Sequence, residues 1–223
     1  MHVLILGDMH GEIKVSVRKD IRQVQEITKA LASKMKILNK SKSINVKRLS
    51  SKAALTWIKR AHVTKDDIFI FYFSGHGYQS KTNSKWPLIY FSKTDKTVDL
   101  RVFIEAIKKK CARLSIILCD ACNSAFRGMP LRISYPGFKF NKGIKTDNAK
   151  QLFITQRGLI VLCAAKPNYN AWASKNGGLM TLTFFSGLKK EINRASPSWV
   201  HLLSVVKRKS MQEPLIYDSV SKG

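Results

Sequence analysis

The chain has 223 residues, of which 44% are hydrophobic, and its 40 lysines and arginines outnumber its 14 aspartates and glutamates to give a formal net charge of +26. This length suits one well-packed domain; the start MHVLILGD lacks a basic leader, and no stretch approaches the roughly 18 apolar residues of a membrane helix. The positive charge is spread along the chain, which favours nonspecific attraction to polyanions at low salt over a dedicated nucleic-acid site. We therefore expect a cytoplasmic protein, a single domain over 1–223 with no prodomain and no membrane span.

Short β-branched runs alternate with amphipathic stretches along the chain. In chain order, the pattern predicts a strand at 2–8, a helix at 15–35, a strand at 35–39, a helix at 50–61, a strand at 67–77, a short outlying strand in 86–92, a helix at 99–112, strands at 114–122 and 158–166, helices at 178–192 and 198–211, and a last strand at 214–219. A polar stretch, about 125–157, is expected to be a flexible loop. The near-continuous apolar strands indicate an α/β fold with a mostly parallel six-stranded sheet and helices on both faces.

Reactive side chains gather where these strands end, which is the edge at which parallel sheets bind ligands. His76 stands between two glycines in FSGHGY, where the backbone can bend close to a ligand. Cys122 follows the strand that contains Cys119, so we expect Cys119 to pack and Cys122 to emerge. Because the two strands are joined by one helix, the histidine and the cysteine should meet, and an imidazole can activate a thiol that is otherwise mostly protonated.

Three other interpretations of these residues exist. A CxxC redox pair usually opens a helix, whereas Cys119 still belongs to the strand. Cys122 could also be a small buried hydrophobe. Asp8 and His10 in LILGDMHGE imitate a metallophosphoesterase motif, but the further metal-binding boxes of that class are absent. The four cysteines show no disulfide framework and no zinc spacing, so no metal is expected.

YFSGHG and LCDACNS, in this order and spacing, resemble the histidine and cysteine boxes of the caspase-like cysteine peptidases, particularly metacaspases and paracaspases. The similarity extends over nearly the whole chain and implies a caspase-like fold. It implies that His76 is the general base and Cys122 the nucleophile. It also implies that the amides of Gly77 and Cys122 form the oxyanion hole, which stabilises the tetrahedral intermediate.

By the same resemblance, Asp120 faces the side chain before the scissile bond, and Asp20 matches the second acid of that pocket. A carboxylate there favours arginine or lysine, so we expect protein or peptide substrates cut after these residues. Calcium activation is doubtful, since no acid lies between the histidine box and Asp95, and no cofactor is expected. The alternative is a caspase-like scaffold that binds without catalysis. Self-cleavage is further expected after one or more of the basic residues of 125–157, which are Arg127, Arg132, Lys139, Lys142, Lys145, Lys150 and Arg157.

Overall fold

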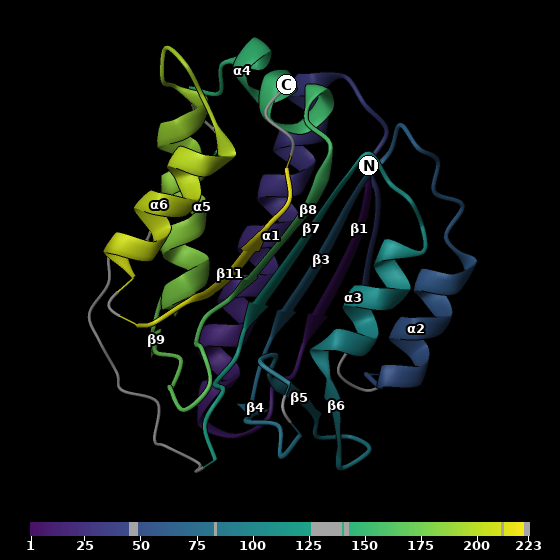
Figure 1. Cartoon of the computed structure of the whole chain (residues 1–223), viewed down its shortest axis with the longest axis vertical. Helices are drawn as coiled ribbons and strands as arrows, with labels where there is room; N and C mark the ends of the chain where they lie inside the picture. Colours follow the sequence, from purple (N-terminus) through teal and green to yellow (C-terminus); the bar gives the residue numbers. More distant parts are fainter. Residues whose placement is uncertain (45–48, 83, 126–139, 141–142, 211, 221–223) are drawn as a thin grey trace.

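The computed structural model describes residues 1–44, 49–82, 84–125, 140, 143–210 and 212–220. A six-stranded sheet crosses its centre in the order β11-β8-β7-β3-β1-β2 (Figure 1). Five strands run parallel, and the edge strand β11 pairs antiparallel with β8. The strands are β1 (His2–Gly7), β2 (Lys40–Ile44), β3 (Ile68–Ser74), β7 (Leu114–Asp120), β8 (Gly158–Cys163) and β11 (Leu215–Asp218). The predicted α/β fold with a mostly parallel six-stranded sheet is confirmed.

Helices cover both faces of this sheet because successive side chains of a strand point to opposite sides. Val3 and Ile5 pack in one apolar layer, and Leu4 and Leu6 in the other. The first layer includes α1 (Lys14–Met35), α5 (Leu179–Ile192) and α6 (Trp199–Lys209), and the second includes α2 (Ser51–Arg60) and α3 (Leu100–Lys108).

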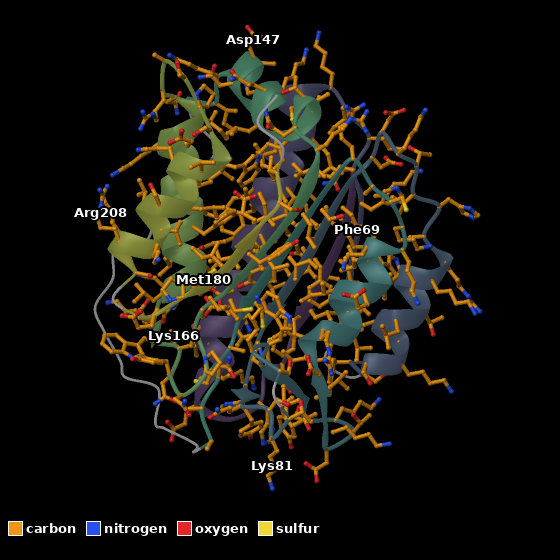
Figure 2. The ribbon with its side chains drawn as sticks, viewed as in Figure 1. Phe69, Lys81, Asp147, Lys166, Met180 and Arg208 are labelled. Atoms are coloured by element: carbon orange, nitrogen blue, oxygen red, sulfur yellow. The ribbon has the colours of Figure 1, made fainter. Side chains whose placement is uncertain are left out.

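Side chains fill the space on both sides of the sheet, whereas charged groups project outward (Figure 2). Met180 belongs to the first layer and Phe69 to the second, both fully buried, while Arg208 extends from α6 into solvent (Figure 2). Among the described residues, no helix has the length and apolarity needed to cross a bilayer.

Smaller elements lie beyond the carboxyl ends of the central strands. One is a three-stranded sheet of β4 (Gly77–Tyr78), β5 (Leu88–Phe91) and β6 (Lys96–Asp99), which contains the predicted outlying strand. Another is a two-stranded hairpin of β9 (Ala173–Ser174) and β10 (Gly177–Gly178). A 3₁₀ turn, η1 (Gly11–Ile13), leads into α1.

The structure corrects two sequence predictions. The second strand lies at 40–44, not at 35–39, because α1 continues to Met35 and ends at Lys36 in a left-handed conformation. Within the predicted loop 125–157, α4 (Thr146–Lys150) and η3 (Gln151–Thr155) are helical and bury Leu152 and Phe153. Four of the predicted cleavage positions lie outside the described residues: Arg127, Arg132, Lys139 and Lys142.

Candidate active site

The strands β3 and β7 bring the two predicted catalytic residues together. Ser74 pairs with Asp120 at the last register position of the two parallel strands, and the Gly75 amide donates to the Asp120 carbonyl at 3.2 Å. His76 and Cys122 each follow two residues later and line the same small pocket, of about 50 Å³. Neighbouring strands and equal offsets from a shared register therefore explain why positions 46 residues apart in the sequence meet.

Glycine beside His76 is needed because the two strand ends approach closely. A Cβ on Gly77 would overlap the carbonyl oxygen of Cys122 and lie 2.8 Å from Cβ of Ala121. A Cβ on Gly75 would lie 2.9 Å from Cβ of Asp8. Both glycines of the histidine motif thus permit the packing that forms the pocket.

The sulfur of Cys122 is held by the main chain of the 166–178 segment. The Ala171 amide donates to Sγ at 3.3 Å, and Sγ lies 3.7 Å from the Ala171 carbonyl oxygen. Burial raises the pKa of the Cys122 thiol, the Ala171 amide opposes this shift, and the nearby charge of Asp120 adds to it. The thiol therefore needs a base to ionise readily near neutral pH.

Cys119 occupies a different environment. It is fully buried within β7, directly beside Cys163 of β8, and burial strongly raises the pKa of its thiol. The two cysteines of the CxxC pattern are thus separated: one packs in the sheet and the other lines the pocket.

Asp20 and Asp120, the two predicted pocket acids, both line this pocket and are buried. Asp20 accepts from Ser74 Oγ at 2.7 Å and from the Gly178 amide at 2.9 Å. Asp120 Oδ2 accepts from the amide and hydroxyl of Thr181, at 2.9 and 2.7 Å. Four donors from three different elements therefore fix two carboxyl groups at the base of one pocket.

Burial dominates the ionisation of this pair. It raises the pKa of Asp120 to about 6, although both Thr181 donors favour the charged form. Burial also raises the pKa of Asp20 well above its ordinary value, and repulsion from Asp120 adds to that shift. Burial thus makes the charged form of both carboxyl groups less favourable than it is in water.

The hairpin β9–β10 lies directly over these acids. A Cβ on Gly177 would overlap Oδ1 of Asp20, and one on Gly178 would overlap Oδ2 of Asp120. Gly177 also has φ of 137°, in the region that favours glycine. The dipeptide is therefore required both by the backbone conformation and by the close approach to two carboxylates.

The sequence motifs assigned no role to several residues that shape the site. Tyr72, fully buried in β3, shares a 2.6 Å hydrogen bond with Thr181 Oγ1, which connects the sheet to α5. Gln212 is buried and accepts from the Trp172 amide at 2.8 Å. Of these residues, only Tyr72 could have been found from the sequence, because a tyrosine hydroxyl within an otherwise apolar buried strand needs a partner.

The Asp8 and His10 pair does not form a metal site. Both carboxylate oxygens of Asp8 accept from Ser92, at 2.7 Å from its amide and 2.6 Å from its hydroxyl, while His10 is exposed. No cluster of metal-ligating side chains occurs in the part of the chain that the structure describes. Asp8 instead connects the end of β1 to the turn after β5.

Comparison with known proteins gives a family and a fold. The model of a peptidase family, described as the caspase domain, matches residues 2–219. The crystal structure of protein GSU0716 from Geobacter sulfurreducens is similar with a TM-score of 0.61 and 12% identity, over 99% of this chain and 93% of that one. At this identity the likeness concerns the fold alone. None of the curated proteins matches the chain.

Proposed function

The chain belongs to the caspase-domain family of peptidases, and we propose that it is a cysteine endopeptidase that cuts after arginine or lysine through His76 and Cys122. One observation carries this proposal: the histidine, the cysteine and two buried carboxyl groups line a single pocket at the carboxyl edge of the sheet. A nucleophile, a base and a counter-charge for a cationic side chain are the parts that such a reaction needs.

In this proposal Cys122 attacks the carbonyl carbon of the scissile bond after His76 accepts the thiol proton. The same imidazole then donates a proton to the leaving amine, and water hydrolyses the thioester. The pKa of the Cys122 thiol, raised by burial, makes a proton acceptor beside it necessary.

The amides of Gly77 and Cys122 are the proposed donors to the oxyanion. Tyr90 donates its amide to the His76 carbonyl, so the neighbouring pair of Gly77 and Ile89 exchanges no hydrogen bonds. The Gly77 amide therefore points away from β5, as a donor to a substrate oxygen requires. This supports the assignment that the family resemblance implies.

Asp120 and Asp20 are the proposed counter-charges for the arginine or lysine side chain. A guanidinium can pair bidentately with a carboxylate, and such a bond strengthens when both groups are shielded from water. Since the present pocket has room for only a few water molecules, the hairpin β9–β10 has to shift for a long cationic side chain to reach the acids. Neither a metal nor another cofactor has a part in this mechanism.

The alternative function is binding without catalysis. It is favoured by the small volume of the pocket and by the two contacts between Ala171 and the sulfur. A scaffold would keep this closed arrangement, whereas an enzyme must open it.

Turnover of fluorogenic peptides that differ only in the residue before the cut distinguishes the two functions. We expect hydrolysis after arginine and lysine, none after aspartate, and no loss of rate in excess chelator. An aspartate-preferring profile would refute the specificity, and no hydrolysis of any peptide by the folded protein would favour the scaffold.

A further inference from the structure

A groove is lined by residues of α2 and α3. These are the two helices on the face of the sheet away from α5 and α6 (Figure 1). Its volume is about 740 Å³, many times that of the candidate active site. Its floor consists of apolar side chains from both helices, and its rim is charged. The floor residues are Leu55, Ile58, Val102 and Ala106, and the rim residues are Lys59, Arg101, Glu105, Lys109 and Lys110.

The apolar floor is more than the core requires. The buried face of α3 is formed by Leu100, Phe103, Ile104 and Ile107. Val102 faces outward and is 45% exposed, and the small Ala106 one turn later leaves the hollow open. A single exposed valine is ordinary, but apolar residues that line one hollow from two helices indicate a binding surface.

The rim is strongly cationic. Four of the nine lining residues are lysine or arginine, against 40 of 223 in the whole chain. The one acid, Glu105, forms an ion pair with Lys108 at 3.2 Å. Lys110 Nζ is fixed, because it donates to the carbonyls of Lys59 and Ala61 at 2.7 and 2.9 Å. The groove thus presents positive charge around an apolar centre.

We propose that this groove binds an amphipathic helix of another protein, with an apolar face flanked by aspartate and glutamate. Leu55 and Ile58 are three residues apart and Val102 and Ala106 four apart, so each row follows one helix face. Two such rows on neighbouring helices form the groove that a third helix fills. A second copy of this chain is a poor occupant, because its charge of +26 would repel the rim. The inference is independent of the proposed peptidase activity.

The test uses a fluorescein-labelled peptide of about 18 residues, long enough for a helical face of several turns, with leucines on one face and alanine and glutamate elsewhere. A control peptide has the same composition, with the leucines distributed around the helix. Fluorescence anisotropy measured at low and at physiological salt separates specific binding from the nonspecific attraction expected for so basic a protein. The variants are Val102→Glu for the floor, Ala106→Trp to fill the hollow, and Lys59→Glu with Arg101→Glu for the rim.

The matched control is Lys207→Glu with Lys209→Glu, which makes the same charge change at exposed positions of α6, away from the groove. We expect each groove variant to weaken binding by about tenfold or more, as for central contacts of an interface, with less than about a twofold change in the control. The circular dichroism of every variant should match that of the wild type.

Four results would overturn the proposal. Equal binding of both peptides, or equal losses in the groove and control variants, would show uniform attraction to negative charge. One-to-one binding of dodecanoate that Val102→Glu abolishes, without binding of the peptide, would assign the groove to a small amphiphile. Sedimentation as a dimer that Val102→Glu dissociates would assign it to a second copy of the chain.

Discussion

The main chain of Ala171 contacts the side chain of Cys122 through both of its polar groups: the amide donates to Sγ at 3.3 Å, and the carbonyl oxygen lies 3.7 Å from the same sulfur. Because these contacts come from the backbone, the position of the 166–178 segment sets the orientation of the thiol. The proposed nucleophile is therefore mechanically connected to the segment that borders the pocket.

The two cysteines of the CxxC pattern should differ sharply in their effect on catalysis. Cys122→Ala removes the proposed nucleophile and should lower turnover of an arginine peptide by at least about a thousandfold. Cys119→Ala removes a fully buried sulfur and should cost about 1–2 kcal/mol of stability while most activity remains. Initial rates and urea unfolding measure the two effects. A folded but inactive Cys119→Ala protein would show that the nucleophile is misassigned.

The stability of the protein should depend on pH through Asp120. Burial raises the pKa of this group to about 6 from an ordinary value of 3.8. Between these values the folded state holds more protons than the unfolded state, so the free energy of unfolding falls as the pH rises. The contribution of Asp120 to the free energy of unfolding is fully present below pH 3.8 and is lost as the pH rises through about 6. The total loss is roughly 3 kcal/mol.

Asp120→Asn keeps the shape of the side chain and cannot ionise. Urea unfolding of both proteins at several pH values from 4 to 7 isolates this contribution as the difference between them. We expect the wild type to lose stability relative to Asp120→Asn as the pH rises through this window. A difference that does not change with pH, or that changes in the opposite direction, would contradict a raised pKa at Asp120.

Gln212 should position the segment that borders the pocket. Its side chain accepts from the Trp172 amide at 2.8 Å, and Trp172 lines the pocket. Gln212→Met keeps most of the volume and removes the acceptor. Because one buried hydrogen bond is lost, we expect KM for an arginine peptide to rise about tenfold, with kcat affected less. Michaelis–Menten kinetics of the wild type, Gln212→Met and Gln212→Ala measure these effects. Wild-type kinetics for Gln212→Met would show that the glutamine only fills space.

Self-cleavage is expected in the 125–157 stretch, but the structure narrows its position. Lys150 lies in α4 beside the buried Ala149 and should resist cleavage, because a protease needs an extended substrate. Intact-mass measurement of the wild type and Cys122→Ala locates any cut. Fragments in the wild type alone, ending at a basic residue other than Lys150, are the expected result. Fragments in both proteins would indicate a contaminating protease, and intact chains in both would disprove self-cleavage.

The fold and the meeting of His76 with Cys122 could be predicted because the buried strands β1, β3, β7 and β8 are almost purely apolar and because β3 ends in a glycine-rich turn. The position of β2 could not, because an edge strand with the sequence KSKSI lacks an apolar pattern and four of its five residues are exposed. The sequence pattern therefore predicts the second strand at 35–39, which is the first apolar run after the helical pattern.

The support around the two acids was also not predictable. Thr181 donates to Asp120 from 61 positions away in the sequence, and Gly178 donates to Asp20 from 158 positions away. Neither residue type signals such a role, since threonine and glycine are common at the start of a helix or in a turn. The two carboxylates could be found from the motifs. Their hydrogen-bond donors could be identified only from the packing of α5 against the sheet.

Covalent labelling of Cys122 by an electrophilic peptide that ends in arginine tests the central claim most directly. We expect intact-mass spectrometry to show one adduct per wild-type chain, located at Cys122 by peptide mapping. We expect no adduct in Cys122→Ala, slow labelling in His76→Ala and in Asp120→Asn, and no labelling by the same electrophile ending in aspartate. Modification of the exposed Cys111 instead, or faster labelling by the aspartate peptide, would contradict the account.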